Sequence, residues 1–183
     1  FGEGLIKAKA LDDRVGCAAL ISLLQKNKQY PFDLHVCFLV QEEVGLRGAK
    51  VVAQTIQPDI AIVAEATTCS DTSGAAAHEM VTKLGEGPAV SILDSASYSD
   101  NSLRELICSF AEQNGLKVQL KKSTAGGNDA GSLQLYGRGT KTVVLSLPCR
   151  YIHSPASVIS KADFETYCRM IQILIDHLED EIG

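Results

Sequence analysis

Thr142-Val-Val-Leu-Ser-Leu147 is the most strongly apolar short run of this sequence. Its length and its β-branched residues are typical of a buried strand. On both sides of this run, apolar stretches of strand length alternate with stretches whose apolar residues have helical spacing. This alternation is typical of βαβ units, so we predict an α/β fold with a largely parallel sheet.

The same pattern places the other elements along the chain. Further strands are predicted at 5–11, 34–40, 60–64, 88–93 and 118–121. Helices are predicted at 14–26, 46–56, 100–114 and 161–178. Ser160 is expected to cap the last helix, because its hydroxyl can accept a hydrogen bond from an amide of the first turn.

The composition indicates one folded domain. The chain has 183 residues, of which 45% are hydrophobic and 21% are charged. A domain of this length can bury roughly two-thirds of the surface that its unfolded chain exposes. The net charge of −5 and the scattered basic residues argue against a nucleic-acid or anionic-membrane surface. Lys121-Lys122 is the densest basic spot, and two lysines make no patch.

Several functional classes lack support in the sequence. No apolar run approaches the roughly 18 to 20 residues of a membrane-spanning helix, and residues 1–4 lack the layout of a signal peptide, so we expect a cytoplasmic protein. The six cysteines are widely spaced without a CxxC pair, and we expect them to be reduced. Neither GxGxxG nor GxxxxGK[ST] occurs, so a nucleotide cofactor has no support.

Acidic residues and one histidine follow the predicted strands. Asp12-Asp13 comes after the first strand, Glu42-Glu43 after the second, Glu65 after the third, and His153 after 142–147. In open α/β sheets, ligands bind outside the carboxyl ends of the strands. We therefore expect these side chains to meet in one crevice.

A divalent metal ion is the simplest way to hold these carboxylates together. Neighbouring carboxylates repel one another, so they must either take up protons or bind a cation. A mixture of Asp, Glu and His suits Zn²⁺, Mn²⁺ or Co²⁺ better than Ca²⁺ or Mg²⁺. Each member also has a structural alternative: Asp12-Asp13 as a helix cap, Glu42-Glu43 as a solvated loop pair, and Glu65 and His153 as structural side chains.

Six segments in succession resemble the motifs of the glutamyl/tetrahedral aminopeptidase family, the di-metal peptidases that are sometimes named endoglucanases. They are Lys9-Ala-Leu-Asp-Asp-Arg-Val-Gly16, Val40-Gln-Glu-Glu-Val-Gly-Leu-Arg-Gly-Ala49, Ile62-Val-Ala-Glu-Ala-Thr67, Leu84-Gly-Glu-Gly-Pro-Ala89, Gly126-Gly-Asn-Asp-Ala-Gly131 and Arg150-Tyr-Ile-His-Ser-Pro155. The resemblance covers essentially the whole chain. It implies a di-zinc exopeptidase-like three-layer sandwich, in which helices flank a mostly parallel mixed sheet.

The resemblance also implies a role for each candidate residue. Asp12 would bridge two divalent ions, with Asp13 supporting it. Glu43 and His153 would complete one metal site, and Glu65 would be a ligand of the other. Glu42 would be the general base, which accepts a proton from the water that attacks the peptide bond. The substrate-binding residues would be Gly127 and Asp129, within 126–129, together with Arg150.

The resemblance further implies that residues 1–183 are a catalytic peptidase domain without two parts that are usual in the family. One is an N-terminal segment that supplies a further histidine, and the other is an inserted dimerisation domain. The metal site that uses Glu65 would therefore be incomplete, and the longer parent protein would be a homo-oligomer. Whether this chain alone is active stays open.

The function implied is a metal-dependent aminopeptidase that releases N-terminal residues from short peptides through a metal-bridging water. Two alternatives remain. A catalytically incomplete metal-binding or scaffolding module would keep the fold and lose the reaction. A glucanase is less favoured, because the chain has no Trp and only 5% aromatic residues to stack on sugar rings.

Overall fold

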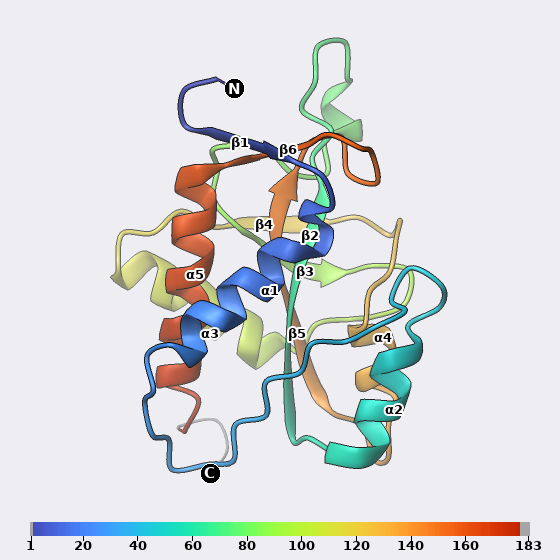
Figure 1. Cartoon of the computed structure of the whole chain (residues 1–183), viewed down its shortest axis with the longest axis vertical. Helices are drawn as coiled ribbons and strands as arrows, with labels where there is room; N and C mark the ends of the chain where they lie inside the picture. Colours follow the sequence, from blue (N-terminus) through green and yellow to red (C-terminus); the bar gives the residue numbers. More distant parts are fainter. Residues whose placement is uncertain (1, 180–183) are drawn as a thin grey trace.

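The main sheet of the computed structural model has four strands in the order β2-β5-β3-β4 (Figure 1). The strands are β2 (Ile60–Thr68), β3 (Ala89–Leu93), β4 (Gln119–Lys122) and β5 (Lys141–Cys149). β2 is parallel to β5 and β3 is parallel to β4, whereas β3 and β5 are antiparallel. The mixed, mostly parallel sheet is thereby confirmed. The structure describes residues 2–179, so Phe1 and residues 180–183 of the predicted domain lie outside the described residues.

Helices cover both faces of this sheet, as Figure 1 shows. On one face lie α1 (Leu11–Leu24), α3 (Asn101–Gln113) and α5 (Lys161–Asp176), and on the other lie α2 (Arg47–Ile56) and the short α4 (Ala130–Leu133). Alternation along β5 builds the two apolar cores, because successive side chains of a strand point to opposite faces. Val143, Leu145 and Leu147 pack against the first group of helices, and Val144 packs against the second. The predicted three-layer sandwich is confirmed.

A second, two-stranded antiparallel sheet joins the start of the chain to the segment before α5. It pairs β1 (Leu5–Ala8) with β6 (Ser157–Ser160). Arg150 exchanges backbone hydrogen bonds with Val158, which ties the end of β5 to β6. The sequence analysis did not predict β6. A 3-10 turn at Ala77–Glu79 lies in the long loop after β2.

The predicted helices are confirmed within a few residues at each end. Their caps follow from side-chain chemistry: the Asp100 carboxylate accepts from the amides of Ser102 and Leu103, and the Ser160 hydroxyl accepts from the amide of Asp163. The six cysteines are free thiols, as expected. None of the helices in the described part of the chain is both long and apolar enough to cross a membrane.

The predicted strand at 34–40 is wrong. The segment alternates between half-buried and exposed side chains, but it belongs to no ladder. A strand needs a neighbour to accept and donate its backbone hydrogen bonds, and β2 pairs only with β5 among the described residues. A cavity of about 780 Å³ is lined by the segment and by the open edge of β2. This cavity also reaches the predicted acidic residues.

Candidate metal centre

The acidic residues and the histidine meet where the sequence places them. Asp12 is the second residue of α1, Glu43 lies in the turn before α2, and His153 lies in the turn after β5. His153 Nε2 is 3.1 Å from Asp12 Oδ2 and 3.5 Å from Glu43 Oε1. One ligand atom from each of the three lies within 4.8 Å of the others. Asp12 is mostly buried, whereas Glu43 and His153 are exposed, so this group opens to solvent.

A second group shares Asp12 with the first. Asp12, Asp13 and Glu65 also offer ligand atoms that all lie within 4.8 Å of one another. Glu65 lies inside β2 rather than at its end, because the ladder with β5 continues to Thr68. One oxygen of its carboxylate accepts a hydrogen bond from the amide of Ala66 at 3.1 Å. A carboxylate common to both groups is the arrangement that two neighbouring ions would need.

The backbone adopts uncommon conformations at these ligands. Ala10, Gln41 and His153 have φ values of 51°, 62° and 61°, which place non-glycine residues in the left-handed region. Left-handed residues of this kind cost of order 1 kcal/mol or more each, and they cluster at functional sites. The strain adds support for a site that the acidic side chains already indicate.

The electrostatics of the cluster fit a divalent ion. Burial, with the charges of Asp12, Glu42 and Asp129, raises the pKa of Asp13 to about 8. Burial and the charges of Asp13 and Asp12 also raise the pKa of Glu65 well above its usual range. Carboxylates forced together in this way repel one another when ionised. A divalent cation would remove that repulsion, so the donors present fit the metal ions that the sequence predicts.

Glu42 belongs to neither ligand group, although it adjoins Glu43. It lines the 780 Å³ cavity and also a second cavity of about 300 Å³, both of which reach Asp12 and Glu65. Burial first, and then the charges of Asp129, Glu43 and Asp12, raise the pKa of Glu42 to about 7. A carboxyl beside the ligands with a pKa near neutrality has the properties of a general base.

The predicted substrate residues lie around the cluster at different depths. Gly127 lines the 300 Å³ cavity. Asp129 lies at the start of α4 and lines the 780 Å³ cavity, and burial raises its pKa. Its Oδ1 is buried and has no hydrogen-bond partner among the described residues. The substrate-binding roles of both residues stay predictions.

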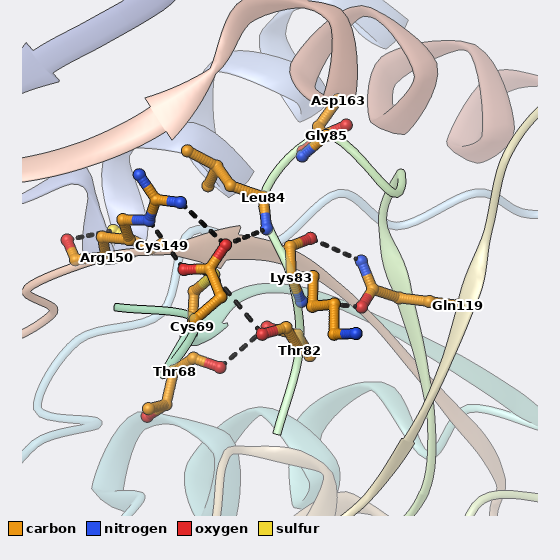
Figure 2. Close-up of polar contacts among 11 residues, drawn as sticks. Thr68, Cys69, Thr82, Lys83, Leu84, Gly85, Gln119, Cys149, Arg150 and Asp163 are labelled. Atoms are coloured by element: carbon orange, nitrogen blue, oxygen red, sulfur yellow. Dashed lines mark hydrogen bonds and ion pairs between the residues drawn. The ribbon is translucent and has the colours of Figure 1, made fainter. Parts of the chain in front are cut away.

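Arg150 is held by another side chain rather than facing the acidic cluster. Its Nε and Nη2 donate to the Asp71 carboxylate at 2.6 and 2.9 Å. The same carboxylate accepts from the amide of Leu84 and the thiol of Cys69, which lie beside Arg150 in Figure 2. The ion pair between Arg150 and Asp71 therefore connects the turn that carries His153 to the loop after β2. The predicted contact of Arg150 with substrate stays a prediction.

Two residues near the site were not predicted to belong to it. Asp71 stands 79 positions from Arg150 in a polar loop, and nothing in the local pattern marks it as a partner. Lys121 is buried and lines the 300 Å³ cavity. A signal for Lys121 existed, because two successive lysines on a strand must point to opposite faces.

Comparison with known families and curated proteins gives results that agree with this geometry. The family model described as M42 glutamyl aminopeptidase matches residues 1–170. A protein of Acetivibrio thermocellus that is named as a candidate aminopeptidase is 38% identical over 164 residues, which are 90% of this chain and 49% of that protein. The chain thus spans about half the length of the curated relatives it matches.

Solved structures are similar over the same extent. An aminopeptidase from the archaeon Desulfurococcus kamchatkensis superposes with a TM-score of 0.92 at 34% identity, covering 97% of this chain and 50% of that one. The TET1 peptidase of Pyrococcus horikoshii, described as assembling into a tetrahedron or an octahedral shell, gives a TM-score of 0.77 at 32% identity. It covers 93% of this chain and 50% of that one.

Proposed function

This chain belongs to the M42 glutamyl aminopeptidase family, and we propose that it forms the catalytic domain of a metal-dependent aminopeptidase that removes N-terminal residues from short peptides. The observation that carries the proposal is the pair of ligand groups that share Asp12, with Glu42 beside them. Membership of the family by itself supports only the fold, whether or not the catalytic side chains are in place. Their convergence supports the reaction.

The two ligand groups would hold two divalent transition-metal ions, Zn²⁺, Co²⁺ or Mn²⁺. Asp12, Glu43 and His153 would hold one ion, and Asp12 and Glu65 would hold the other with Asp13 in support. When bound, such ions lower the pKa of water and polarise a carbonyl oxygen. Because the second group has no histidine among residues 2–179, we propose that it binds its ion more weakly than the first.

The chain's own residues would position the substrate and move the proton. Glu42 accepts a proton from the attacking water and returns it to the amine of the leaving peptide, so no covalent bond to the protein is needed. The cavity beside Gly127 holds the first residue of the peptide next to Glu42. Burial and the charges of Asp129, Glu43 and Asp12 raise the pKa of Glu42 to about 7, so its carboxylate can take up a proton near neutral pH.

The proposal extends to the setting in which the enzyme works. We propose a homo-oligomeric parent protein in the cytoplasm, with short peptides as its partners. Support for the oligomer comes from the Pyrococcus horikoshii peptidase, which is described as assembling into a tetrahedron or a large octahedral shell. A closed assembly of that kind would admit short peptides more readily than folded proteins.

Two neighbouring substitutions test the proposed roles. Glu42→Gln removes the base but leaves both ligand groups, so hydrolysis of amino-acid anilides should fall at least a hundredfold while metal content, counted by mass spectrometry, is kept. Glu43→Gln removes a ligand, so metal content should fall together with turnover. Equal loss of metal in both variants would refute the division of roles. A metal-loaded wild type that hydrolyses no anilide would refute the activity for this chain.

A further inference from the structure

The imidazole ring of His153 has few contacts of its own. Its side chain is 62% exposed, and its Nε2 faces Asp12 and Glu43, which would be ligands of the same ion. Its Nδ1 has no hydrogen bond among residues 2–179. A histidine that binds a metal ion usually donates its second ring nitrogen to a carboxylate or a carbonyl, and this contact fixes the ring. The direction of the His153 ring therefore depends on the backbone that carries it.

The turn that carries His153 has an uncommon backbone. Tyr151 and His153 have φ values of 56° and 61°, in the left-handed region that L residues rarely adopt. Such conformations persist only where the surrounding structure holds them in place. At the base of the turn, Arg150 exchanges backbone hydrogen bonds with Val158 at 2.9 and 3.0 Å. The side chain of Arg150 gives this base a second attachment.

The second attachment is the ion pair of Arg150 with Asp71. Arg150 Nε lies 2.6 Å from Asp71 Oδ1, and Nη2 lies 2.9 Å from Oδ2. Two parallel bonds from a planar guanidinium fix its orientation as well as its distance from the carboxylate. The two side chains are 30% and 11% exposed, so solvent screens the pair only in part. Each oxygen of Asp71 accepts one further hydrogen bond, from the Cys69 thiol or the Leu84 amide (Figure 2), so the carboxylate is itself held in place.

We propose that Arg150 and Asp71 are positioning residues of the metal centre. Their ion pair holds the turn in the orientation that brings His153 to Asp12 and Glu43, and it thereby sets the affinity of these three ligands for their divalent ion. Neither member of the pair lines the two cavities that reach the ligands, so the pair acts through the turn and not by touching the ion. The proposal rests on the metal centre of the function proposed above.

The positive charge of Arg150 lets one substitution separate positioning from electrostatics. Removing a positive charge near a cation site should by electrostatics alone strengthen the binding of the ion. Positioning predicts the opposite sign: Arg150→Gln should raise the dissociation constant for Zn²⁺ by roughly ten- to a hundredfold, the range for losing a contact that orients a ligand. Asp71→Asn should raise it to a similar extent. Arg150→Lys keeps the charge but not the two parallel bonds, so its loss should be smaller.

Competition with a chromogenic chelator near neutral pH measures the dissociation constant for Zn²⁺. The reference protein and every variant carry Glu65→Gln, which removes a ligand of the second group, so the measurement reports the group that contains His153. Ile107→Val, a change at a buried position on α3, is the control for lost stability and should leave the dissociation constant unchanged. Circular dichroism verifies that each variant is folded at the temperature of the titration.

A double-mutant cycle shows whether the effect passes through His153. In a protein that already carries His153→Ala, adding Arg150→Gln should change the dissociation constant less than about twofold, because the ligand that the pair positions is gone. Titration calorimetry extends the measurement to the weaker binding expected in this background. An equal loss of affinity with and without His153 would overturn the proposal, since the pair would then act on the fold as a whole. Unchanged or tighter binding in Arg150→Gln alone would overturn it too.

The outcome for this ion pair is separate from the outcome for the proposed activity, because the readout is metal affinity and not hydrolysis. Tight binding of Zn²⁺ without turnover of any anilide would refute the aminopeptidase and leave the positioning role standing. Unchanged metal affinity in Arg150→Gln and Asp71→Asn would refute the positioning role and leave the aminopeptidase standing. A reference protein that binds no Zn²⁺ would refute the metal centre, and the positioning role would fall with it.

Discussion

Replacing Asp13 with asparagine should flatten the pH dependence of stability in the metal-free protein. Burial and neighbouring charges raise the pKa of Asp13 from 3.8 to about 8 in the folded chain. A carboxyl whose pKa is higher in the folded state holds its proton more tightly there than in the unfolded state. The free energy of unfolding therefore falls as pH rises from about 4 to about 8, over the range between the two pKa values.

The magnitude follows from the difference between the two pKa values. Each pH unit in that range costs about 1.4 kcal/mol, so raising the pH from 5 to 8 should lower the free energy of unfolding by roughly 3 to 4 kcal/mol. This is an upper figure, because part of the raised pKa comes from the charges of Asp12, Glu42 and Asp129. For a chain of this size it corresponds to a fall in Tm of roughly 10 °C. Asp13→Asn has no carboxyl proton to lose and gains no negative charge as the pH rises, so the variant should keep most of that stability at pH 8.

Urea unfolding in chelator at pH 5, 6.5 and 8 measures the effect. Glu112→Gln, at an exposed position on α3, is the matched control and should follow the wild type. Excess Mn²⁺ or Zn²⁺ at pH 8 should restore stability to the wild type, because the cation replaces the missing protons. A metal-free wild type that is as stable at pH 8 as at pH 5 would refute the reasoning. So would an Asp13→Asn variant that loses as much stability as the wild type.

Two further predictions concern the loops around the site. Gly87→Ala should cost roughly 3 kcal/mol or more in urea unfolding, because the new methyl would lie 2.0 Å from a backbone oxygen at a φ of +83°. Gly85→Ala, at φ +86° with open space, should cost only about 1 kcal/mol, and equal costs would contradict the steric argument. Asp71→Asn should lower the free energy of unfolding by about 1 to 3 kcal/mol at pH 7, because it weakens the pair with Arg150. Arg150 holds the pKa of Asp71 well below its usual range, so the stabilisation by this pair is complete above about pH 4 and is lost as the pH falls further. In thermal unfolding, the difference between Asp71→Asn and the wild type should therefore be smaller at pH 3 than at pH 7.

The fold was largely predictable because most of its elements carry their signal locally. The strand at Lys141–Cys149 is apolar on both faces, and the helix at Lys161–Asp176 has a periodic apolar side and a serine cap. The segment 34–40 shows where local signals fail. Its composition is that of a strand, but a ladder also needs a neighbouring strand, and the composition of the segment itself does not show whether one is present. The extension of β2 past Glu65 has the same origin, since pairing with β5 and not apolar character sets its end.

The candidate site was predictable because its side chains follow elements that end near one another. His153 follows β5 of the main sheet, whereas Asp12 follows β1 of the second sheet and Glu43 follows the unpaired segment 34–40, and the three still lie together. Arg150 was assigned by resemblance to a contact with substrate, and its partner Asp71 comes from a loop whose path no local pattern reveals. The burial of Lys121 follows from strand alternation, but which of two adjacent lysines turns inward depends on the register with β3.

The hydrogen bond from the Ala66 amide to the Glu65 carboxylate makes one backbone proton a reporter of the metal centre. That proton is sheltered from exchange with solvent while a carboxylate oxygen of Glu65 holds it. A metal ion bound to the same Glu65 oxygen would weaken the hydrogen bond from the Ala66 amide, so the amide proton would exchange faster. The hydrogen-exchange rate of the Ala66 amide in β2 therefore reports whether the metal centre is occupied, and it can be followed without observing the ion itself.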